Sequence, residues 1–584
     1  MARQLEHFPN LVTMFFTRAR EKGDAPFLWA KHDGSWHSIS WADAARQVAA
    51  FAESLKRIGL QPGDRVMLVS ENRPEWLIAD LGIMAAGCVT VPAYTTNTTR
   101  DHTHILGNSG SKAVIVSTQK LAKNLIPAVL FSSDCHHVIG IEDLRTGQAP
   151  GTVDFHHWDE MVSGQSDLGE LERRMQQVGR NDLACLIYTS GTGGAPRGVM
   201  QHHGSILANI EGCTDIISTD FGWDDETFLS FLPASHAYEH TGGQHFPIGL
   251  GAQIYYAESL EKLAANIEEV RPTIMVVVPR LFEMLRARIL KTIEASGGLS
   301  QYLLRRALSI GAKTNEGRSN PLDLPMKAIL SVTLRKKVRA RFGGRIKAMV
   351  SGGAPLNPEV GLFFQSVGLT FLQGYGQTEA GPVISCNRPA AGVRMDSVGP
   401  PVKNAEVRIA DDGEIMVRGE LVMHGYWQNS EETARVLQPD GWLATGDVGH
   451  LDDAGRIVIT DRKKDLIVND KGDNVSPQRV EGMLTLQPEI AQAMVYGDRR
   501  PYLVGLLVPE AEFANKPDLQ QRLSKAVDKV NADSSVIERV RRFIIADEPF
   551  TTDNEQLTPS LKIRRHVIKK VYGERLDALY GKKD

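Results

Sequence analysis

The segment that says most about the fold is LACLIYTSGTGGAPRGV, residues 183–199. Its first six residues are apolar and have the length of a buried strand. The strand runs into three hydroxyl side chains interspersed with glycines, namely Thr189, Ser190, Gly191, Thr192, Gly193 and Gly194, and Arg197 follows shortly after. Successive glycines let backbone N–H groups converge on an anion, and the hydroxyls add donors. The segment therefore predicts a strand that ends in a phosphate-binding loop.

Two common phosphate motifs are excluded for this loop. The spacing GxxxxGK[ST] of a Walker A loop is absent, and so is the GxGxxG of a dinucleotide-binding turn. The alternative interpretation is a polar surface loop that happens to follow a strand.

On the amino-terminal side of this segment, apolar strands alternate with helical patterns. Expected helices cover 41–58, 75–86 and 100–108, and expected strands are 64–70, 88–94 and 112–118. This alternation predicts parallel strands covered by helices.

On the carboxyl-terminal side the same alternation continues and then changes. Residues 260–270 predict a helix, 273–279 a buried strand, and 347–356 a strand that runs into a glycine turn, whereas 311–325 predict a loop or insertion. From about 395 to 461, Asp-Gly and Ala-Gly turns at 411–413 and 452–455 predict antiparallel hairpins. A charged junction at 461–465 precedes the last part of the chain.

The predicted fold class is therefore α/β. We expect a large N-terminal domain over residues 1–461, built of parallel α/β subdomains plus a β-rich hairpin subdomain at about 395–461. A small α+β domain is expected over residues 462–584.

Composition excludes several classes of protein. The 584 residues include 42% apolar and 23% charged residues, which is ordinary globular usage rather than a disordered or coiled-coil chain. The 66 basic and 70 acidic residues give a net charge of −4, so nothing indicates a nucleic-acid partner. Five scattered cysteines without a CxxC pair argue against a disulfide scaffold or thiolate metal site, and suit the cytoplasm. No signal peptide and no apolar run of about 20 residues is found.

The loop and six further segments, in order, resemble the motifs of the AMP-forming adenylating enzymes, which include acyl-CoA synthetases, luciferases and peptide-synthetase adenylation domains. The six segments are LSFLPASHAYEH (229–240), SGGAPL (351–356), GYGQTEAG (374–381), WLATGD (442–447), 461–481 and LTPSLKIRR (557–565). The family loop usually reads S-G-T-T-G-x-P-K-G, so Gly193 and Arg197 depart from it, as does Lys471 where a glycine is common.

The resemblance implies ATP, Mg²⁺ and CoA as cofactors and substrates, and it implies site residues. Phosphate binding would fall to Thr189–Gly194 and Arg197, the adenine side to Gly352, Gly353 and Ala354, and further nucleotide contacts to Gln373, Gly374, Tyr375, Gly376 and Thr378. Asp447 would bind the ribose with Arg462 beside it, Glu379 would hold Mg²⁺, and Lys562 would bridge the carboxylate and the α-phosphate. Thr189 and His236 would line the reaction centre, and Lys464 would be the hinge of a mobile C-terminal domain.

The implied reaction joins a carboxylate to ATP, giving acyl-AMP and pyrophosphate, and a thiol then attacks the mixed anhydride. An anion attacks an anion, so positioning and charge neutralisation carry the catalysis. Segments 229–240 and 557–565 look most like the long-chain branch of the family, which implies a fatty acid.

Three functions stay open: a fatty-acid–CoA ligase, an acyl-AMP ligase that passes the acyl group to a carrier protein, and a non-catalytic lipid- or nucleotide-binding relative. Residues 560–584 carry eight Lys/Arg and three Asp/Glu. This basic end is compatible with loose attachment to the inner, anionic face of a membrane, and more simply with CoA phosphates or solvation.

A competing metal interpretation attaches to His236-Ala-Tyr-Glu-His240, which matches the H-x-x-E-H pattern of some zinc peptidases. On a helix, His236 and His240 would face one metal with Glu239 as base. The histidine pairs at 136–137, 156–157 and 202–203 have no defensible partner spacing and are predicted to lie on the surface.

Overall fold

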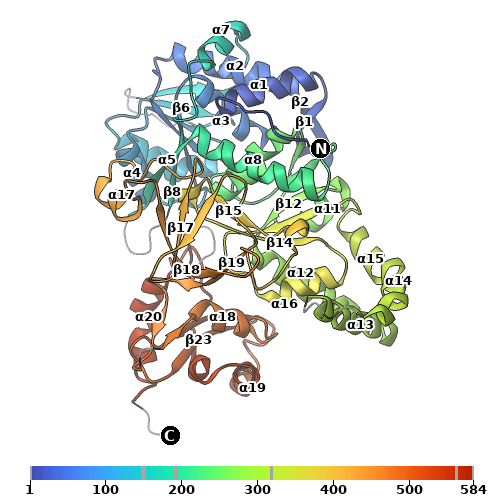
Figure 1. Ribbon diagram of the computed structural model, residues 1–584. Coiled ribbons are helices and arrows are strands. Elements are labelled where there is room, and N and C mark those ends of the chain that lie inside the picture. Colours follow the sequence, from blue (N-terminus) through green and yellow to red (C-terminus); the bar gives the residue numbers. More distant parts are fainter. Residues whose placement is uncertain are drawn as a thin grey trace.

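The computed structural model describes residues 3–145, 153–189, 195–315, 318, 320–471, 473–558 and 563–581. Figure 1 shows two large α/β sheets with their helices, a twisted hairpin sheet beside them, and a small body formed by the last elements of the chain. Their order along the chain follows the order in which the sequence patterns change.

The first large sheet has seven strands and contains the strand of the glycine-rich segment. Its order is β7 (Asp154–His157), β6 (His137–Gly140), β5 (Ala113–Val116), β3 (Arg65–Val69), β4 (Val89–Ala93), β8 (Leu183–Thr189) and β9 (Arg197–His202). All pairs are parallel except β8 and β9, which form an antiparallel hairpin. The predicted parallel alternation is therefore confirmed.

The second large sheet has eight strands. Its order is β15 (Val383–Cys386), β14 (Phe371–Gly376), β13 (Ala348–Ser351), β12 (Ile274–Val277), β10 (Thr227–Ser230), β11 (Gln253–Tyr256), β1 (Pro26–His32) and β2 (Ser35–Ser40). Neighbouring strands from β14 to β1 are parallel, and the two edge strands, β15 and β2, run antiparallel to their neighbours.

Both large sheets are covered by helices. The helices before β10 are α1 (Leu11–Lys22), α2 (Trp41–Arg57), α3 (Pro74–Ala85), α4 (Thr99–Ser109), α5 (Gln119–Leu130), α6 (Trp158–Val162), α7 (Leu168–Met175) and α8 (His203–Asp220). The later ones are α9 (Ala237–Glu239), η1 (His240–His245), α10 (Phe246–Leu250), α11 (Leu263–Val270), α12 (Pro279–Ala295), α13 (Gly298–Asn315), α14 (Leu324–Val332), α15 (Leu334–Arg341) and α16 (Pro358–Ser366). Local chemistry fixes several starts; at α4, Thr98 and Asp101 form a reciprocal capping box.

The hairpin sheet follows the order β16 (Glu406–Ile409), β17 (Glu414–Arg418), β18 (Leu443–Leu451) and β19 (Ile457–Arg462), with α17 (Ser430–Val436) inserted before β18. Every neighbouring pair is antiparallel. The hairpins predicted from the turns at 411–413 and 452–455 are confirmed.

The last body contains a two-stranded sheet, β20 (Ile467–Val468) and β21 (Asn474–Val475), and a three-stranded sheet, β22 (Ile490–Tyr496), β23 (Leu503–Pro509) and β24 (Val540–Ile545). Helices α18 (Pro477–Thr485), α19 (Leu519–Ala532) and α20 (Arg565–Asp577) pack on it. Arg565 donates to both oxygens of the buried Glu481 at 2.7 and 2.6 Å, which ties α20 to α18.

Two predictions, one of a helix and one of a loop, were wrong in their bounds. The helix expected over 260–270 begins at Leu263, and Leu260 is exposed. The loop expected over 311–325 is helical up to Asn315, and α14 starts at Leu324. Gly311 does not break α13, because it is the close-packing point against α16: a Cβ there would lie 1.9 Å from Ser366 Oγ.

The parallel core predicts a measurable stability difference between two leucines. Leu68 in β3 is completely buried, whereas Leu260 is 63% exposed. We expect Leu68→Ala to lower the free energy of unfolding by about 2–5 kcal/mol, through lost burial and a residual cavity. Leu260→Ala, the matched control, should stay within about 0.5 kcal/mol of the wild type in urea unfolding. Equal losses in both variants would contradict this assignment of the core.

Candidate functional site

The predicted site residues gather at the carboxyl ends of parallel strands, where ligands bind in open α/β sheets. Thr189 ends β8, and residues 231–240 follow β10. Gly352 follows β13, while Tyr375 and Glu379 lie at and just beyond the end of β14. The hairpin sheet closes over this edge and contributes β18 and β19.

A buried carboxylate, Asp447 on β18, lies at the centre of the site. The Tyr375 hydroxyl donates to Asp447 Oδ2 at 2.7 Å, and Arg462 Nε donates to Oδ1 at 3.1 Å. Asp447 and Arg462 are direct cross-strand neighbours between β18 and β19. Asp447 is 4% exposed, and burial together with this carboxylate raises the pKa of Tyr375 well above its usual value, so the phenol stays a donor.

A second chain of contacts joins Glu379 to Arg197. Tyr426 donates its hydroxyl to Glu379 Oε1 at 2.8 Å, and the Arg197 guanidinium lies 5.3 Å from the Tyr426 ring centroid. Arg197 also forms an ion pair with Glu432 of α17. The charge of Glu379 is close enough to Arg462 to help raise that guanidinium's pKa, although burial acts in the opposite direction. The two groups of residues therefore form one charged site.

The turn that holds Glu379 is fixed by its backbone. Buried Gln201 donates to the carbonyl of Thr378 at 2.7 Å, and the Met423 N–H donates to the carbonyl of Glu379 at 3.0 Å. Gly376 has no room for a side chain, because a Cβ would lie 1.8 Å from the carbonyl oxygen of Pro382. The Glu379 side chain therefore projects from a rigid support.

The loop after β13 lies against the segment that contains His236. A Cβ on Gly352 would come within 2.8 Å of the Tyr238 ring, whose hydroxyl donates to the carbonyl of Val350 at 2.8 Å. His236 caps α9 by accepting from the Tyr238 N–H at 3.2 Å. These contacts bring the predicted acyl-side and adenine-side segments together.

The remaining predicted residues differ in how they are placed. Gln373 pairs with Ser351 across β14 and β13 and precedes Gly374 in the same strand, whereas Gly353 is half-buried and Ala354 is exposed. Lys464 is exposed in the turn after β19, next to Lys463, which pairs with Asp412 and Glu414. Ser190, Gly191, Thr192, Gly193, Gly194 and Lys562 lie outside the described residues.

Two residues of this site were missed in the sequence. Tyr426 and Glu432 connect Glu379 to Arg197, yet nothing in the pattern around either residue marks it. Residues 424–427 run along β9, which places Tyr426 opposite Val199. The Trp427 N–H donates to the carbonyl of Gly198 at 2.7 Å. The contact joins residues more than 200 positions apart.

The H-x-x-E-H segment does not bring its two histidines to one point. His240 is turned to Asp80 of α3, with Nε2 at 3.1 Å from Oδ2, and His245 lies 2.9 Å from the same oxygen. Pairing with the two imidazoles holds the pKa of Asp80 well below its usual value despite its burial. Among the described residues, these three form the cluster with metal-like spacing, and His236 is not part of it.

The surface prediction for the pair His202 and His203 was wrong, because both are buried. His202 Nδ1 accepts from the Ser205 N–H at 3.2 Å, which caps α8, and its Nε2 lies 3.1 Å from the carbonyl of Val422, to which it donates. Burial lowers the pKa of His203 to about 3, so it is neutral at physiological pH. A charge pattern cannot distinguish such satisfied core histidines from solvated ones.

Glu239, between the two histidines of the segment, belongs to a buried polar network. It accepts from Ser230 at 2.6 Å and from Gln244 at 3.3 Å, and Tyr256 donates to Gln244 at 2.9 Å. The α-carbon of Gly243 lies against this carboxyl, leaving no room for a Cβ. Burial raises the pKa of Glu239 to about 8, so the group is protonated at neutral pH.

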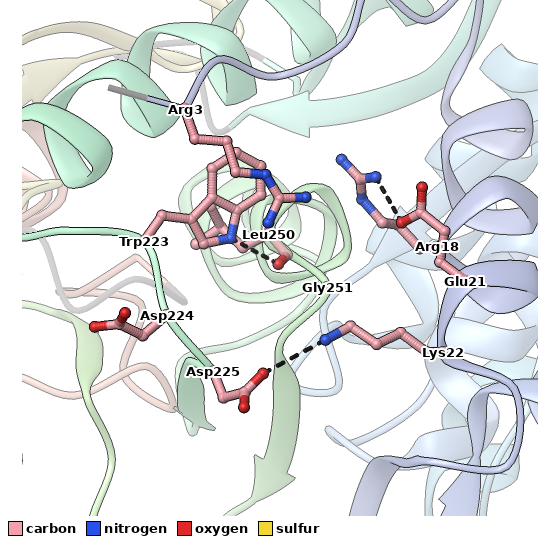
Figure 2. Close-up of a pocket in the computed structure, with 9 residues that line it drawn as sticks. All are labelled: Arg3, Arg18, Glu21, Lys22, Trp223, Asp224, Asp225, Leu250 and Gly251. Atoms are coloured by element: carbon pink, nitrogen blue, oxygen red, sulfur yellow. Dashed lines mark hydrogen bonds and ion pairs between the residues drawn. The ribbon is translucent and has the colours of Figure 1, made fainter. Parts of the chain in front are cut away.

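A polar cavity of about 360 Å³ lies at the opposite, amino ends of β10 and β11 (Figure 2). Charged side chains that line the cavity form ion pairs with other residues of the protein. Lys22 pairs with Asp225 at 3.5 Å, and the buried Arg18 pairs with Glu21 and Glu6. Figure 2 shows Arg3 lying over the Trp223 ring, 3.9 Å from its centroid. This cavity is separate from the strand ends where the predicted residues gather.

Comparison with known proteins gives a consistent result. The model of the family "AMP-binding enzyme" matches residues 15–427, and that of "AMP-binding enzyme C-terminal domain" matches 464–584. The long-chain-fatty-acid–CoA ligase FadD15 of Mycobacterium bovis is 32% identical in sequence. The alignment covers 98% of this chain and 97% of the FadD15 chain. The chloroplastic long-chain-fatty-acid–[acyl-carrier-protein] ligase AEE15 of Arabidopsis thaliana is 27% identical, over 96% and 85%.

Among solved structures, the A domain of a carboxylic acid reductase from Segniliparus rugosus, in complex with AMP and a co-purified carboxylic acid, has the same fold. The TM-score is 0.76 at 21% identity, and the match covers 99% of this chain and 95% of that one.

The buried carboxyl of Glu239 predicts a pH-dependent stability. Between about pH 4.5 and 8, Glu239 is ionised in the unfolded chain and protonated in the folded protein. The free energy of unfolding therefore falls as the pH rises through this range. Glu239→Gln keeps the acceptor for Ser230 and removes the titration. We expect the difference in melting temperature, variant minus wild type, to be larger at pH 8 than at pH 5 by about 2 °C or more. Parallel pH profiles would contradict a buried, protonated Glu239.

Proposed function

Because the chain belongs to the AMP-binding enzyme family, we propose that it activates a long-chain fatty acid with ATP and transfers the acyl group to CoA. The products are acyl-AMP and pyrophosphate in the first step, and acyl-CoA and AMP in the second. The observation that carries the proposal is the Asp447 centre, with Tyr375, Arg462 and Glu379 converging at the carboxyl ends of the strands.

Asp447 has the free acceptor capacity that a ribose diol needs. Each carboxylate oxygen has two lone pairs, and each already accepts one hydrogen bond from Tyr375 or Arg462. One lone pair on each oxygen remains for the two ribose hydroxyls. The two donors fix the carboxylate in place, so ordering it costs little when the nucleotide binds.

Glu379 has the properties of a magnesium ligand. Tyr426 holds Oε1, whereas Oε2 accepts no hydrogen bond from the described residues. Mg²⁺ prefers one or two carboxylates together with phosphate oxygens and water, so a half-buried carboxylate on a rigid turn fits it. When bound, the ion would neutralise phosphate charge that opposes attack by the carboxylate.

The cations of the site would offset the remaining charge. In this structure the Arg197 guanidinium is paired with Glu432, so phosphate binding would exchange one anionic partner for another. Lys562 would bridge the fatty-acid carboxylate and the α-phosphate, and Thr189 and the following residues would contact the phosphates. Gly352, Gly353 and Ala354 would lie beside the adenine. Domain movement about Lys464 would separate the two half-reactions.

The acyl substrate and the location of the reaction follow from chemistry and from the relatives. A long acyl chain gains about 0.8 kcal/mol of binding free energy for each CH₂ group that is buried, so it binds best in an apolar site. FadD15 of Mycobacterium bovis is named for such an acid and for CoA. Five free cysteines, which suit a reducing compartment, support a cytoplasmic location as part of this proposal. A carrier-protein acceptor is the second candidate, because AEE15 of Arabidopsis thaliana is named for one.

The test of this function is ATP–pyrophosphate exchange over a series of acids from acetate to stearate, first without and then with CoA. We expect exchange with long acids and, after addition of CoA, the corresponding thioester. Exchange without thioester would replace CoA by a carrier protein. Absence of exchange with every acid would contradict the proposal.

The magnesium assignment gives a second prediction. Glu379→Gln removes the negative charge but keeps the shape and the hydrogen bond from Tyr426. We expect the Mg²⁺ concentration for half-maximal exchange to rise about tenfold or more, because a charged ligand contributes at least about 1.4 kcal/mol. Glu431→Gln, on the nearby α17 but 80% exposed, is the matched control. An unchanged Mg²⁺ titration in Glu379→Gln would remove the assignment.

A further inference from the structure

The segment from α12 to the start of β13, residues 279–347, has a charge unlike the rest of the chain. It contains 16 Lys/Arg and four Asp/Glu, a net charge of +12 within a protein whose net charge is −4. The segment forms α12, α13, α14 and α15. Figure 1 shows α13, α14 and α15 as a lobe at the edge of the molecule, whereas α12 lies inward, beside α16. The remaining chain therefore has a net charge of −16, and this segment is more basic than the other basic stretch of the chain, residues 560–584.

The lobe also exposes large apolar side chains. Helix α14 reads LPMKAILSV, yet Leu330 is the one residue of its nine that is buried. Six large side chains of α14 and the neighbouring elements are exposed, although Met326 of α14 is partly buried against the core: Leu299 is 73%, Tyr302 51%, Leu322 84%, Leu324 62%, Ile329 46% and Val332 68% exposed. Four of the six lie within eleven consecutive residues, 322–332, and large apolar side chains exposed so close together mark an interaction site.

The basic helix follows the apolar one directly. Helix α15 reads LRKKVRAR, and five of its eight residues are Lys or Arg. Lys336 and Lys337 are exposed and have no acidic partner within 4.0 Å among the described residues, whereas Arg341 pairs with Glu268 at 2.9 Å. The two helices therefore place unpaired positive charge next to unburied apolar side chains.

The lobe is attached rigidly to the part of the protein that carries the site. Gly311 of α13 packs directly on Ser366 of α16, and Arg335 of α15 donates to the Ser366 carbonyl at 3.1 Å. Helix α16 lies between β13 and β14, whose ends hold the predicted nucleotide residues. Any partner surface to which the lobe binds would therefore keep a fixed orientation relative to the candidate site at the ends of β13 and β14.

We propose that the lobe formed by α13, α14 and α15 docks on the surface of an anionic lipid bilayer. Apolar side chains enter the boundary between headgroups and acyl chains, while lysines and arginines beside them pair with lipid phosphates and carboxylates. A basic surface alone would fit any polyanion, and an apolar surface alone would fit an uncharged protein partner; the bilayer surface satisfies both. No helix of the described residues is long and apolar enough to span a membrane, so the contact is peripheral. This inference goes beyond the proposed ligase reaction and does not depend on it.

The experiment is co-sedimentation of the full chain with vesicles of phosphatidylcholine alone and of phosphatidylcholine mixed with phosphatidylserine. We expect binding to the mixed vesicles, weakened by salt, and little binding to the neutral ones. Lys336→Glu/Lys337→Glu should lower the partition coefficient by about 30-fold or more, since each lysine near the surface contributes about 1 kcal/mol. Leu322→Ser/Val332→Ser should weaken binding without changing its salt dependence.

Matched controls lie on α5. Lys120→Glu/Lys123→Glu makes the same charge change at exposed lysines, and Phe131→Ser removes an apolar side chain that is 82% exposed. Both controls should bind like the wild type. A wild-type chain that stays in the supernatant with the mixed vesicles would overturn the proposal, as would equal losses in the α5 controls. Binding to an acidic carrier protein through the lobe, without vesicle binding, would replace the bilayer by a protein partner.

Discussion

The arrangement of the site depends on the buried carboxylate of Asp447 and its two donors. A buried, ionised carboxylate is costly unless it is paired, so Tyr375 and Arg462 must both stay in contact with it. One donor comes from the mostly parallel eight-stranded sheet and the other from the antiparallel hairpin sheet. The pairing therefore fixes two differently built sheets against each other, at the edge where the parallel strands end. The same edge holds Glu379, whose turn is fixed by Gln201 and Met423.

Local patterns predicted the local elements of this fold. Apolar runs separated by helical spacing placed the parallel strands, and Asp-Gly and Ala-Gly turns placed the hairpins at 411–413 and 452–455. Motif order pointed to Tyr375, Glu379 and Asp447, which lie together in the structure; their roles toward a nucleotide stay predictions. Tyr426 and Glu432 could not be predicted, because their partners are distant in sequence. The helical course through Gly311 depends on a tertiary contact with Ser366 for the same reason.

Buried polar groups explain where pattern reading failed. His202 and His203 look like a solvated pair in sequence, but His202 caps α8 and donates to the carbonyl of Val422. His240 looks like a metal ligand paired with His236, but it is directed at Asp80. In each case the hydrogen-bonding partner comes from another element, and a satisfied buried histidine has no local signature. The positive charge of residues 279–347, in contrast, is visible in the sequence, whereas the exposure of α14 is visible only in the structure.

The most direct test of the Asp447 centre compares ATP with 2′,3′-dideoxy-ATP in pyrophosphate exchange, for the wild type and for Asp447→Asn. In the wild type, loss of the ribose hydroxyls should lower kcat/KM by about 10- to 100-fold, because hydrogen bonds to a charged group contribute about 1.5–3 kcal/mol. In Asp447→Asn, which keeps the shape of the carboxylate, the two nucleotides should differ much less. Equal discrimination by both enzymes would show that Asp447 does not contact the ribose and would contradict the account.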